Sequence, residues 1–193
     1  MTRREAFQSQ NAFGQEGQNV VMLSLLKGGC SVQKADADNW RDMVANIGGQ
    51  TFRLEIKNED RHQHTGNIAI ETFQGRNKKP SGLSITSSDV WIHKIGAMCV
   101  AYRVPDMKTW LYECASIFKL SPKPFAGADG GCGGYVVPIR FLDNRSWTDT
   151  IALESLHTSK VFKKKIVSAT EPDGSEETGL QQLDLFGDGA VTA

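Results

Sequence analysis

Apolar side chains recur at helical spacing in two parts of the chain. Between residues 11 and 27 they are followed directly by Gly28 and Gly29. An amphipathic helix presents apolar residues every three to four positions and commonly stops at glycine, so this segment predicts a helix over residues 14–27. A second pattern of the same kind predicts a helix over residues 106–119, with Asp106 as its N-cap.

Alternating apolar and polar side chains predict strands in the middle of the chain. Residues 42–47 and 50–57 are joined by two glycines, which is a signal for a β-hairpin. The order of helix, several strands and helix predicts an α/β or α+β domain with a mixed central sheet flanked by helices. The remaining expectations are strands over 67–73, 89–95, 98–104 and 135–142, a loop over 126–134 and a short helix within 146–160.

The composition is that of a globular protein. The chain has 193 residues, of which 39% are hydrophobic and 23% charged, enough for one domain with its own core. We find no uninterrupted apolar run of membrane-spanning length and no apolar segment behind Arg3 and Arg4, so we expect a cytoplasmic protein without a membrane segment. The four cysteines lack the paired spacing of zinc or iron–sulfur sites and are expected to be reduced thiols.

The formal net charge of zero conceals an uneven distribution. No Lys or Arg follows Lys165, whereas six acids do, so residues 1–165 carry all 22 basic residues and 16 of the 22 acids, a net charge of +6. A basic body with an acidic tail is typical of proteins that act on nucleic acids, although an ordinary body with a solvated tail gives the same numbers. Residues 169–180 are rich in charge and turn formers, which predicts a disordered linker.

The predicted hairpin brings together two acids and a lysine. Strand alternation places Glu55 and Lys57 on one face, and a turn at residues 48–49 sets Asp42 opposite Glu55. Facing carboxylates repel unless something neutralises them, and a divalent cation with oxygen ligands does so. We therefore predict a Mg²⁺ or Mn²⁺ site formed by Asp42, Glu55 and the main-chain carbonyl of Ile56. Lys57 would position water or offset charge on a phosphate. The alternative is a solvated strand face with Asp42 as an ordinary turn acid.

A helix carrying Glu16, then Asp42, then Glu55-Ile56-Lys57 resembles the PD-(D/E)XK nuclease superfamily. Segments 57–60, 65–71, 80–83 and 86–91 are similar to small phage-type members, and the likeness covers roughly residues 14–104. It implies a restriction-endonuclease-like core, a Mg²⁺-dependent deoxyribonuclease, and catalytic roles for Glu16, Asp42, Glu55 and Lys57. One departure is that Arg41 stands where the family motif has proline, which leaves Asp36 and Asp38 as rivals of Asp42 for the first metal ligand.

The tail contains a second motif. Gln182, Leu183, Asp184, Leu185 and Phe186 resemble, at all five positions, the peptide with which bacterial proteins bind the β sliding clamp. A short apolar peptide on a disordered arm can become ordered on binding and tether an enzyme to its partner. The alternative is a C-terminal turn that packs on the body. The domain prediction is therefore a nuclease-like domain over residues 1–168 and an acidic tail over 169–193 with a clamp-binding peptide at 182–186.

These features predict a nuclease acting on branched, flapped or gapped DNA, or a junction resolvase, in replication, recombination or repair. A restriction-type endonuclease and an exonuclease fit the same core. We expect a homodimer if both strands are cut, and the host cytoplasm as location if a phage encodes the chain. The alternative from another class is a non-catalytic DNA- or clamp-binding regulator of replication, against which stands the intact acid–acid–lysine set, because a pure binder has no need of carboxylates beside phosphate.

Overall fold

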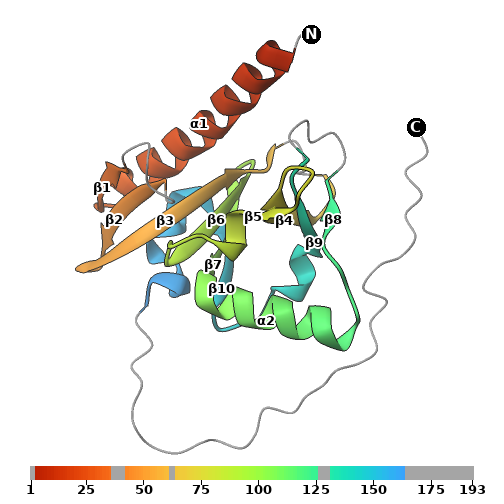
Figure 1. The fold of residues 1–193 in the computed structure, drawn as a ribbon. Coiled ribbons are helices and arrows are strands. Elements are labelled where there is room, and N and C mark those ends of the chain that lie inside the picture. Colours follow the sequence, from red (N-terminus) through yellow and green to blue (C-terminus); the bar gives the residue numbers. More distant parts are fainter. Residues whose placement is uncertain (1–2, 36–41, 61–63, 126–130, 164–193) are drawn as a thin grey trace, which may run out of the picture.

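Two sheets and two α-helices make up the part of the chain that the computed structural model describes, which is residues 3–35, 42–60, 64–125 and 131–163 (Figure 1). One sheet contains, in spatial order, β1 (Ser31–Lys34), β2 (Met43–Ile47), β3 (Gln50–Asn58), β6 (Val90–Ile95), β7 (Met98–Arg103) and β10 (Thr148–Ala152). The other contains β5 (Lys79–Pro80), β4 (Asn67–Gln74), β9 (Gly133–Pro138) and β8 (Lys123–Pro124).

The six-stranded sheet is mixed, as the sequence predicts. Strands β3 and β6 are parallel, and the other neighbours in this sheet are antiparallel. The hairpin β2–β3 turns at Gly48 and Gly49, whose φ angles of 60° and 78° are those that a tight two-residue hairpin turn requires. Ile47 pairs with Gln50 and Met43 with Leu54, so the predicted register of the hairpin is confirmed.

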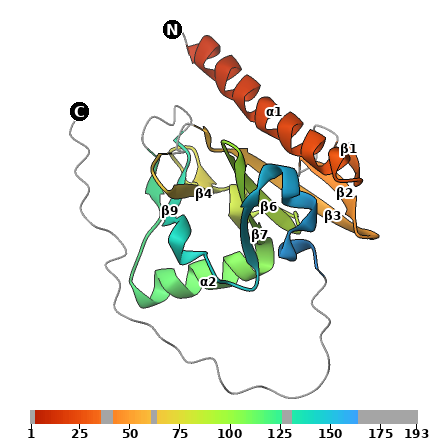
Figure 2. The same ribbon diagram turned by 180° about the vertical axis from the view of Figure 1, so that it is seen from behind.

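Helices and the smaller sheet cover the two faces of the six-stranded sheet (Figures 1 and 2). Helix α1 (Arg3–Lys27) and the short 3-10 helices η4 (Leu153–Thr158) and η5 (Lys160–Phe162) pack against one face, where Val21 and Leu25 join Leu54, Ile56 and Ile92 in a buried core. On the other face, β4, β9 and α2 (Val104–Ile117) enclose a second core around Trp91 and Tyr102.

Several predicted elements differ from the observed ones. The first helix begins at Arg3 rather than at residue 14. Residues 3–13 are the mostly polar first part of this α-helix, and a prediction from apolar periodicity does not detect them. The N-cap of α2 is Arg103, so the prediction for Asp106 was wrong; Asp106 lies in the first turn and pairs with Arg103 at 3.0 Å. Residues 146–160 contain strand β10 before η4, in place of a short helix alone.

The smaller sheet was not foreseen. The predicted strand over 67–73 exists as β4, but it pairs with β9 and β5 instead of joining the central sheet. Strand β9 begins at Gly133 inside the predicted loop and ends at Pro138, and η3 (Ile139–Phe141) follows it. Strand β1 was also not predicted. Within the described ranges no helix is long and apolar enough to cross a bilayer.

Candidate active site

Asp42 lies directly before β2 and continues the hairpin ladder with its side chain. Its main-chain N–H donates to the Leu54 carbonyl at 2.9 Å, and its Oδ2 accepts a hydrogen bond from the Ile56 N–H at 2.6 Å. The carboxylate thus extends the pairing with β3 by one hydrogen bond beyond the N-terminal end of β2. Because the N–H and C=O of one strand residue point to the same side, the Ile56 carbonyl faces this edge as well.

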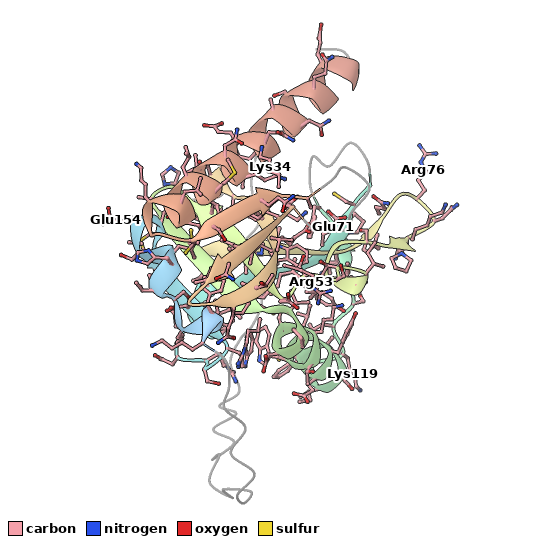
Figure 3. All side chains as sticks on the ribbon, turned by 90° about the vertical axis from the view of Figure 1, so that its left-hand side faces the viewer. Lys34, Arg53, Glu71, Arg76, Lys119 and Glu154 are labelled. Carbon is pink, nitrogen blue, oxygen red and sulfur yellow. The ribbon has the colours of Figure 1, made fainter. Side chains whose placement is uncertain are left out.

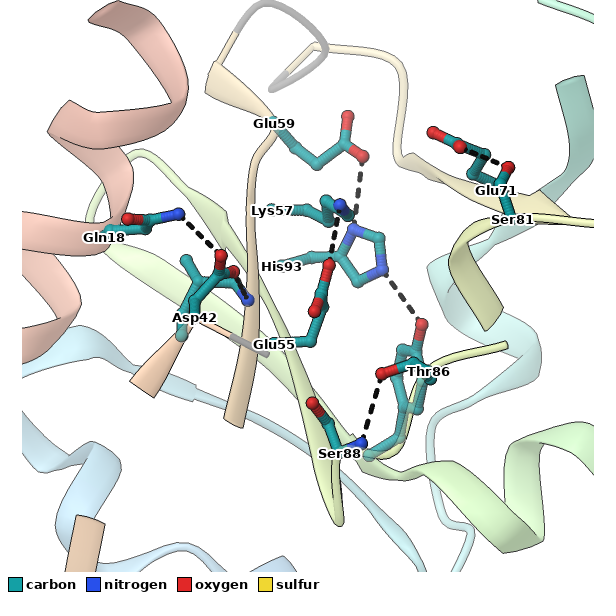
Figure 4. Close-up of polar contacts among 12 residues, drawn as sticks. Gln18, Asp42, Glu55, Lys57, Glu59, Glu71, Ser81, Thr86, Ser88 and His93 are labelled. Carbon is teal, nitrogen blue, oxygen red and sulfur yellow. Dashed lines mark hydrogen bonds and ion pairs between the residues drawn. The ribbon is translucent and has the colours of Figure 1, made fainter. Parts of the chain in front are cut away.

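Helix α1 reaches the same edge at a point of close packing. A Cβ atom on Gly17 would lie 2.6 Å from the Cβ of Asn58, so this approach requires glycine. The Asn58 side-chain amide donates to the Phe13 carbonyl at 2.8 Å and fixes the helix on β3. One residue further along, Gln18 Nε2 donates to Asp42 Oδ1 at 2.7 Å (Figure 4). The helix therefore approaches the predicted site through Gln18.

Glu16, the helix acid that the family resemblance assigned to the site, is exposed. Gln18 was not predicted as a site residue. The rotation of α1 about its axis, as it packs on β3, determines that Gln18 faces Asp42. The rival first ligands Asp36 and Asp38 lie outside the described residues, as does the peptide formed by Gln182, Leu183, Asp184, Leu185 and Phe186.

Glu55 and Lys57 project together from β3 toward the smaller sheet. Lys57 Nζ is 2.9 Å from Glu55 Oε1, with side-chain exposures of 35% and 13%, respectively. The ammonium also lies 5.3 Å from the ring centroid of Trp91, a distance at which a cation is attracted to an aromatic face. Leu54 and Ile56 are buried on the opposite face, which confirms the alternation predicted from the sequence.

A buried polar array supports this face from the neighbouring strand. In the parallel pairing of β3 and β6, Lys57 is opposite His93. The His93 ring is fully buried, with Nδ1 3.1 Å from Glu59 Oε1 and Nε2 3.1 Å from Tyr102 Oη. It stacks on Trp91 at a centroid distance of 6.0 Å. The sequence predicts a strand over residues 89–95, whereas the hydrogen-bond partners of His93 come from other segments of the chain.

Glu71 approaches the site from the smaller sheet. The sequence alone does not show whether this side chain faces the site or the solvent. It accepts a hydrogen bond from Ser81 Oγ at 2.5 Å, and its charge contributes to raising the pKa of Lys57 (Figure 4). The structure thus brings Asp42, Glu55, Lys57 and Glu71 into one electrostatic neighbourhood, contributed by two sheets.

The ionisation of this group reflects its burial and mutual charges. Burial, together with the negative charge of Glu55, raises the pKa of Asp42 from 3.8 to about 6, against the lowering effects of the Ile56 N–H and Lys57. Burial alone would lower the pKa of Lys57, but the carboxylates of Glu55, Asp42 and Glu71 together raise it above its ordinary value. Lys57 is therefore an ammonium at neutral pH, a form that can donate hydrogen bonds but has no lone pair with which to accept a proton.

The donor set fits a hard divalent cation. Asp42 and Glu55 are carboxylates, and the Ile56 carbonyl faces the same edge, so oxygen ligands of the kind that Mg²⁺ and Mn²⁺ prefer are present. Each carboxylate oxygen of Asp42 accepts one hydrogen bond, which leaves further lone pairs for an ion. A positive ion would also offset the negative charge of Glu55 that, after burial, raises the pKa of Asp42. Among the described residues, no cluster of three or more His, Cys, Asp and Glu side chains is arranged to hold a metal.

Comparison with known proteins gives one distant structural likeness. No protein-family model matches the chain, and no curated protein matches it. The solved structure of a bacterial homing endonuclease is similar over 52% of this chain and 73% of that chain, with 17% sequence identity and a TM-score of 0.42. A likeness this distant decides neither family nor reaction, so the functional conclusion rests on the geometry of the chain's own side chains.

Proposed function

We propose that the chain is a metal-dependent DNA nuclease of PD-(D/E)XK type. The observation that carries this proposal is the convergence of Asp42, Glu55 and Lys57 where β2 begins beside β3. Asp42, Glu55 and the Ile56 carbonyl are the ligands we assign to Mg²⁺ or Mn²⁺. When bound, such an ion polarises a phosphate and makes a water molecule more acidic.

The protein side chains supply the remaining requirements of phosphodiester hydrolysis. A bond forms between a water oxygen and phosphorus as the water releases a proton to solvent, and the bond from phosphorus to one nucleotide oxygen breaks as that oxygen takes up a proton. Negative charge accumulates on the phosphate oxygens between these two events. The Lys57 ammonium, kept protonated by its carboxylate neighbours, donates to these oxygens or orients the water. Gln18 and the Ile56 N–H hold Asp42 in one orientation.

A cleavage assay on labelled DNA tests the proposal. We expect wild-type protein to cut at least one member of a panel of single-stranded, duplex, gapped, flapped and four-way DNA in Mg²⁺ or Mn²⁺, and EDTA to stop the reaction. Glu55→Gln, purified identically, excludes a contaminating nuclease, and exposed Glu154→Gln is the matched control (Figure 3). A well-folded wild type that cuts nothing in any metal contradicts the proposal and favours a non-catalytic DNA- or clamp-binding regulator.

The substrate we infer is a DNA structure, such as a branch, flap, gap or four-way junction, and not a long sequence. In support, the described residues form two sheets and two α-helices around the site, which leaves little separate apparatus among them for reading base edges in the grooves. Replication, recombination or repair is the corresponding setting. Cutting both strands of a junction would require a homodimer.

Recruitment by a bacterial β sliding clamp is the second part of the proposal. Its support is the five-position match of residues 182–186 within a polar, acidic tail. A peptide on such an arm raises the local concentration of the enzyme at clamp-loaded DNA without any further contact.

Deleting residues 181–187 should abolish binding to the immobilised clamp while leaving cleavage of free DNA unchanged. The matched control is deletion of residues 174–180, which shortens the tail equally but keeps the motif. Surface plasmon resonance measures the first effect, and the labelled-DNA assay measures the second. Clamp affinity that survives the motif deletion would refute this role of the tail.

A further inference from the structure

The hairpin between β4 and β5 carries a concentrated positive charge away from the body of the protein. Residues 74–80 contain Arg76, Lys78 and Lys79 and no acid. All three cationic side chains are exposed. Figure 3 shows Arg76, in the turn that follows β4, projecting into solvent well beyond Glu71 of β4. We propose that the tip of this hairpin binds the sugar-phosphate backbone of the DNA on which the active site acts, an inference that rests on the proposed function.

The tip has a defined shape. Gln74 pairs with Lys79 in the ladder, and the Lys78 N–H donates to the Gly75 carbonyl at 3.0 Å. Lys78 Nζ lies 5.6 Å from the centroid of the Phe73 ring, which restrains this side chain beside the strand. A hairpin fixed in this way presents its cations at little further cost in conformational entropy on binding.

Lys78 occupies a backbone conformation that its side chain does not favour. Its φ angle is 49°, in the left-handed region where Gly and Asn are the usual residues. The turn alone would be served as well or better by asparagine. The geometry of the turn therefore does not favour lysine at this position, and the charge of Lys78 is what the DNA-binding role would use.

The same strand connects the tip to the active site. Glu71, whose charge acts on Lys57, precedes Arg76 by five residues on the β4 side of the hairpin. At about 3.3 Å per residue, the tip is within roughly 17 Å of Glu71. Each strand of duplex DNA presents one phosphate per about 3.4 Å of axis, so about five phosphates of one strand span that distance. A DNA backbone that enters the site beside Lys57 is therefore long enough to reach the hairpin, which favours nucleic acid over an acidic protein as its partner.

Binding of labelled DNA in EDTA, where no cleavage occurs, tests the inference. We compare the triple variant Arg76→Gln, Lys78→Gln, Lys79→Gln with a charge-matched control, Lys27→Gln, Lys119→Gln, Arg140→Gln, whose three residues are exposed on other elements. By fluorescence anisotropy we expect the hairpin variant to bind at least about tenfold more weakly at moderate salt. The logarithm of the binding constant decreases linearly with the logarithm of the salt concentration. The magnitude of this slope should be smaller by up to about 2.7 for duplex DNA, since each lost phosphate contact removes about 0.9.

Lys78→Asn gives a second, independent readout. It should weaken DNA binding while leaving the midpoint of urea unfolding unchanged or higher, because asparagine suits the left-handed backbone better. Equal losses in both triple variants would attribute binding to net charge alone and overturn the inference, as would unchanged affinity and salt slope in the hairpin variant. Selective loss of binding in a protein that cuts no DNA would leave the docking role standing and reject the nuclease proposal.

Discussion

Lys57→Met is expected to lower DNA cleavage by at least about two to three orders of magnitude, the scale on which removal of one donor to a developing anion acts. Methionine retains an unbranched apolar stem beside Trp91 but removes the ammonium that lies 2.9 Å from Glu55. The DNA panel in Mg²⁺ measures the loss. Lys27→Met, at the exposed end of α1, is the matched control and should cleave like the wild type.

Two further measurements separate loss of chemistry from loss of folding. Lys57→Met leaves Glu55 and Asp42 without their common positive neighbour, so we expect a lower Tm than that of the wild type in the absence of metal. Anisotropy in EDTA should still detect DNA binding at 20 °C if the fold is intact. A folded Lys57→Met protein that binds DNA and cleaves at more than a tenth of the wild-type rate contradicts the role we give to Lys57.

The hairpin at the centre of the site was predictable because its determinants are local. A two-residue glycine turn fixes the pairing, and a period of two then decides which side chains share a face. These two facts suffice to place Asp42 just before β2 and beside Glu55, and to place Lys57 next to Glu55, as the structure has them. No distant contact is needed for either inference.

The other side of the site depends on contacts that a local pattern does not encode. Glu71 reaches Lys57 because β4 pairs with β9, some 65 residues later in the chain, and forms a second sheet over β6 and β7. The alternation of residues 67–73 predicts a strand correctly but leaves its partner open. His93 is similar, since its partners Glu59 and Tyr102 come from two other segments.

The helix residue at the site shows the same limit on a smaller scale. Successive residues of a helix are rotated by about 100°, so positions 16 and 18 point in nearly opposite directions. Which of them faces Asp42 depends on the rotation of α1 against β3, and the close contact of Gly17 with Asn58 sets that rotation. The family pattern favours an acid at this place, whereas the packing selects Gln18.

Asp42→Asn is expected to abolish cleavage and, at the same time, to stabilise the metal-free protein above pH 6. The pKa of Asp42 is raised from 3.8 to about 6 in the folded state, so the native state binds a proton more tightly than the unfolded chain does. Stability therefore falls as the pH rises through this window, by up to about 3 kcal/mol for a fully realised difference. Asparagine removes the charge, and its Oδ1 can still accept the Ile56 N–H while the Gln18 amide turns to accept from Nδ2.

If the charge of Asp42 causes the difference, the gain in free energy of unfolding from Asp42→Asn must depend on pH. In urea unfolding with EDTA, Asp42→Asn and wild type should have nearly equal free energies of unfolding below about pH 3, where Asp42 is protonated in both states, and should diverge by pH 8. Mg²⁺ should raise the stability of the wild type at pH 8 and have a much smaller effect on the variant, because a ligand that binds only the native state stabilises it by mass action. A pH-independent difference would attribute the gain to packing. A wild type that Mg²⁺ does not stabilise would remove Asp42 from the metal site, whatever the variant does to cleavage.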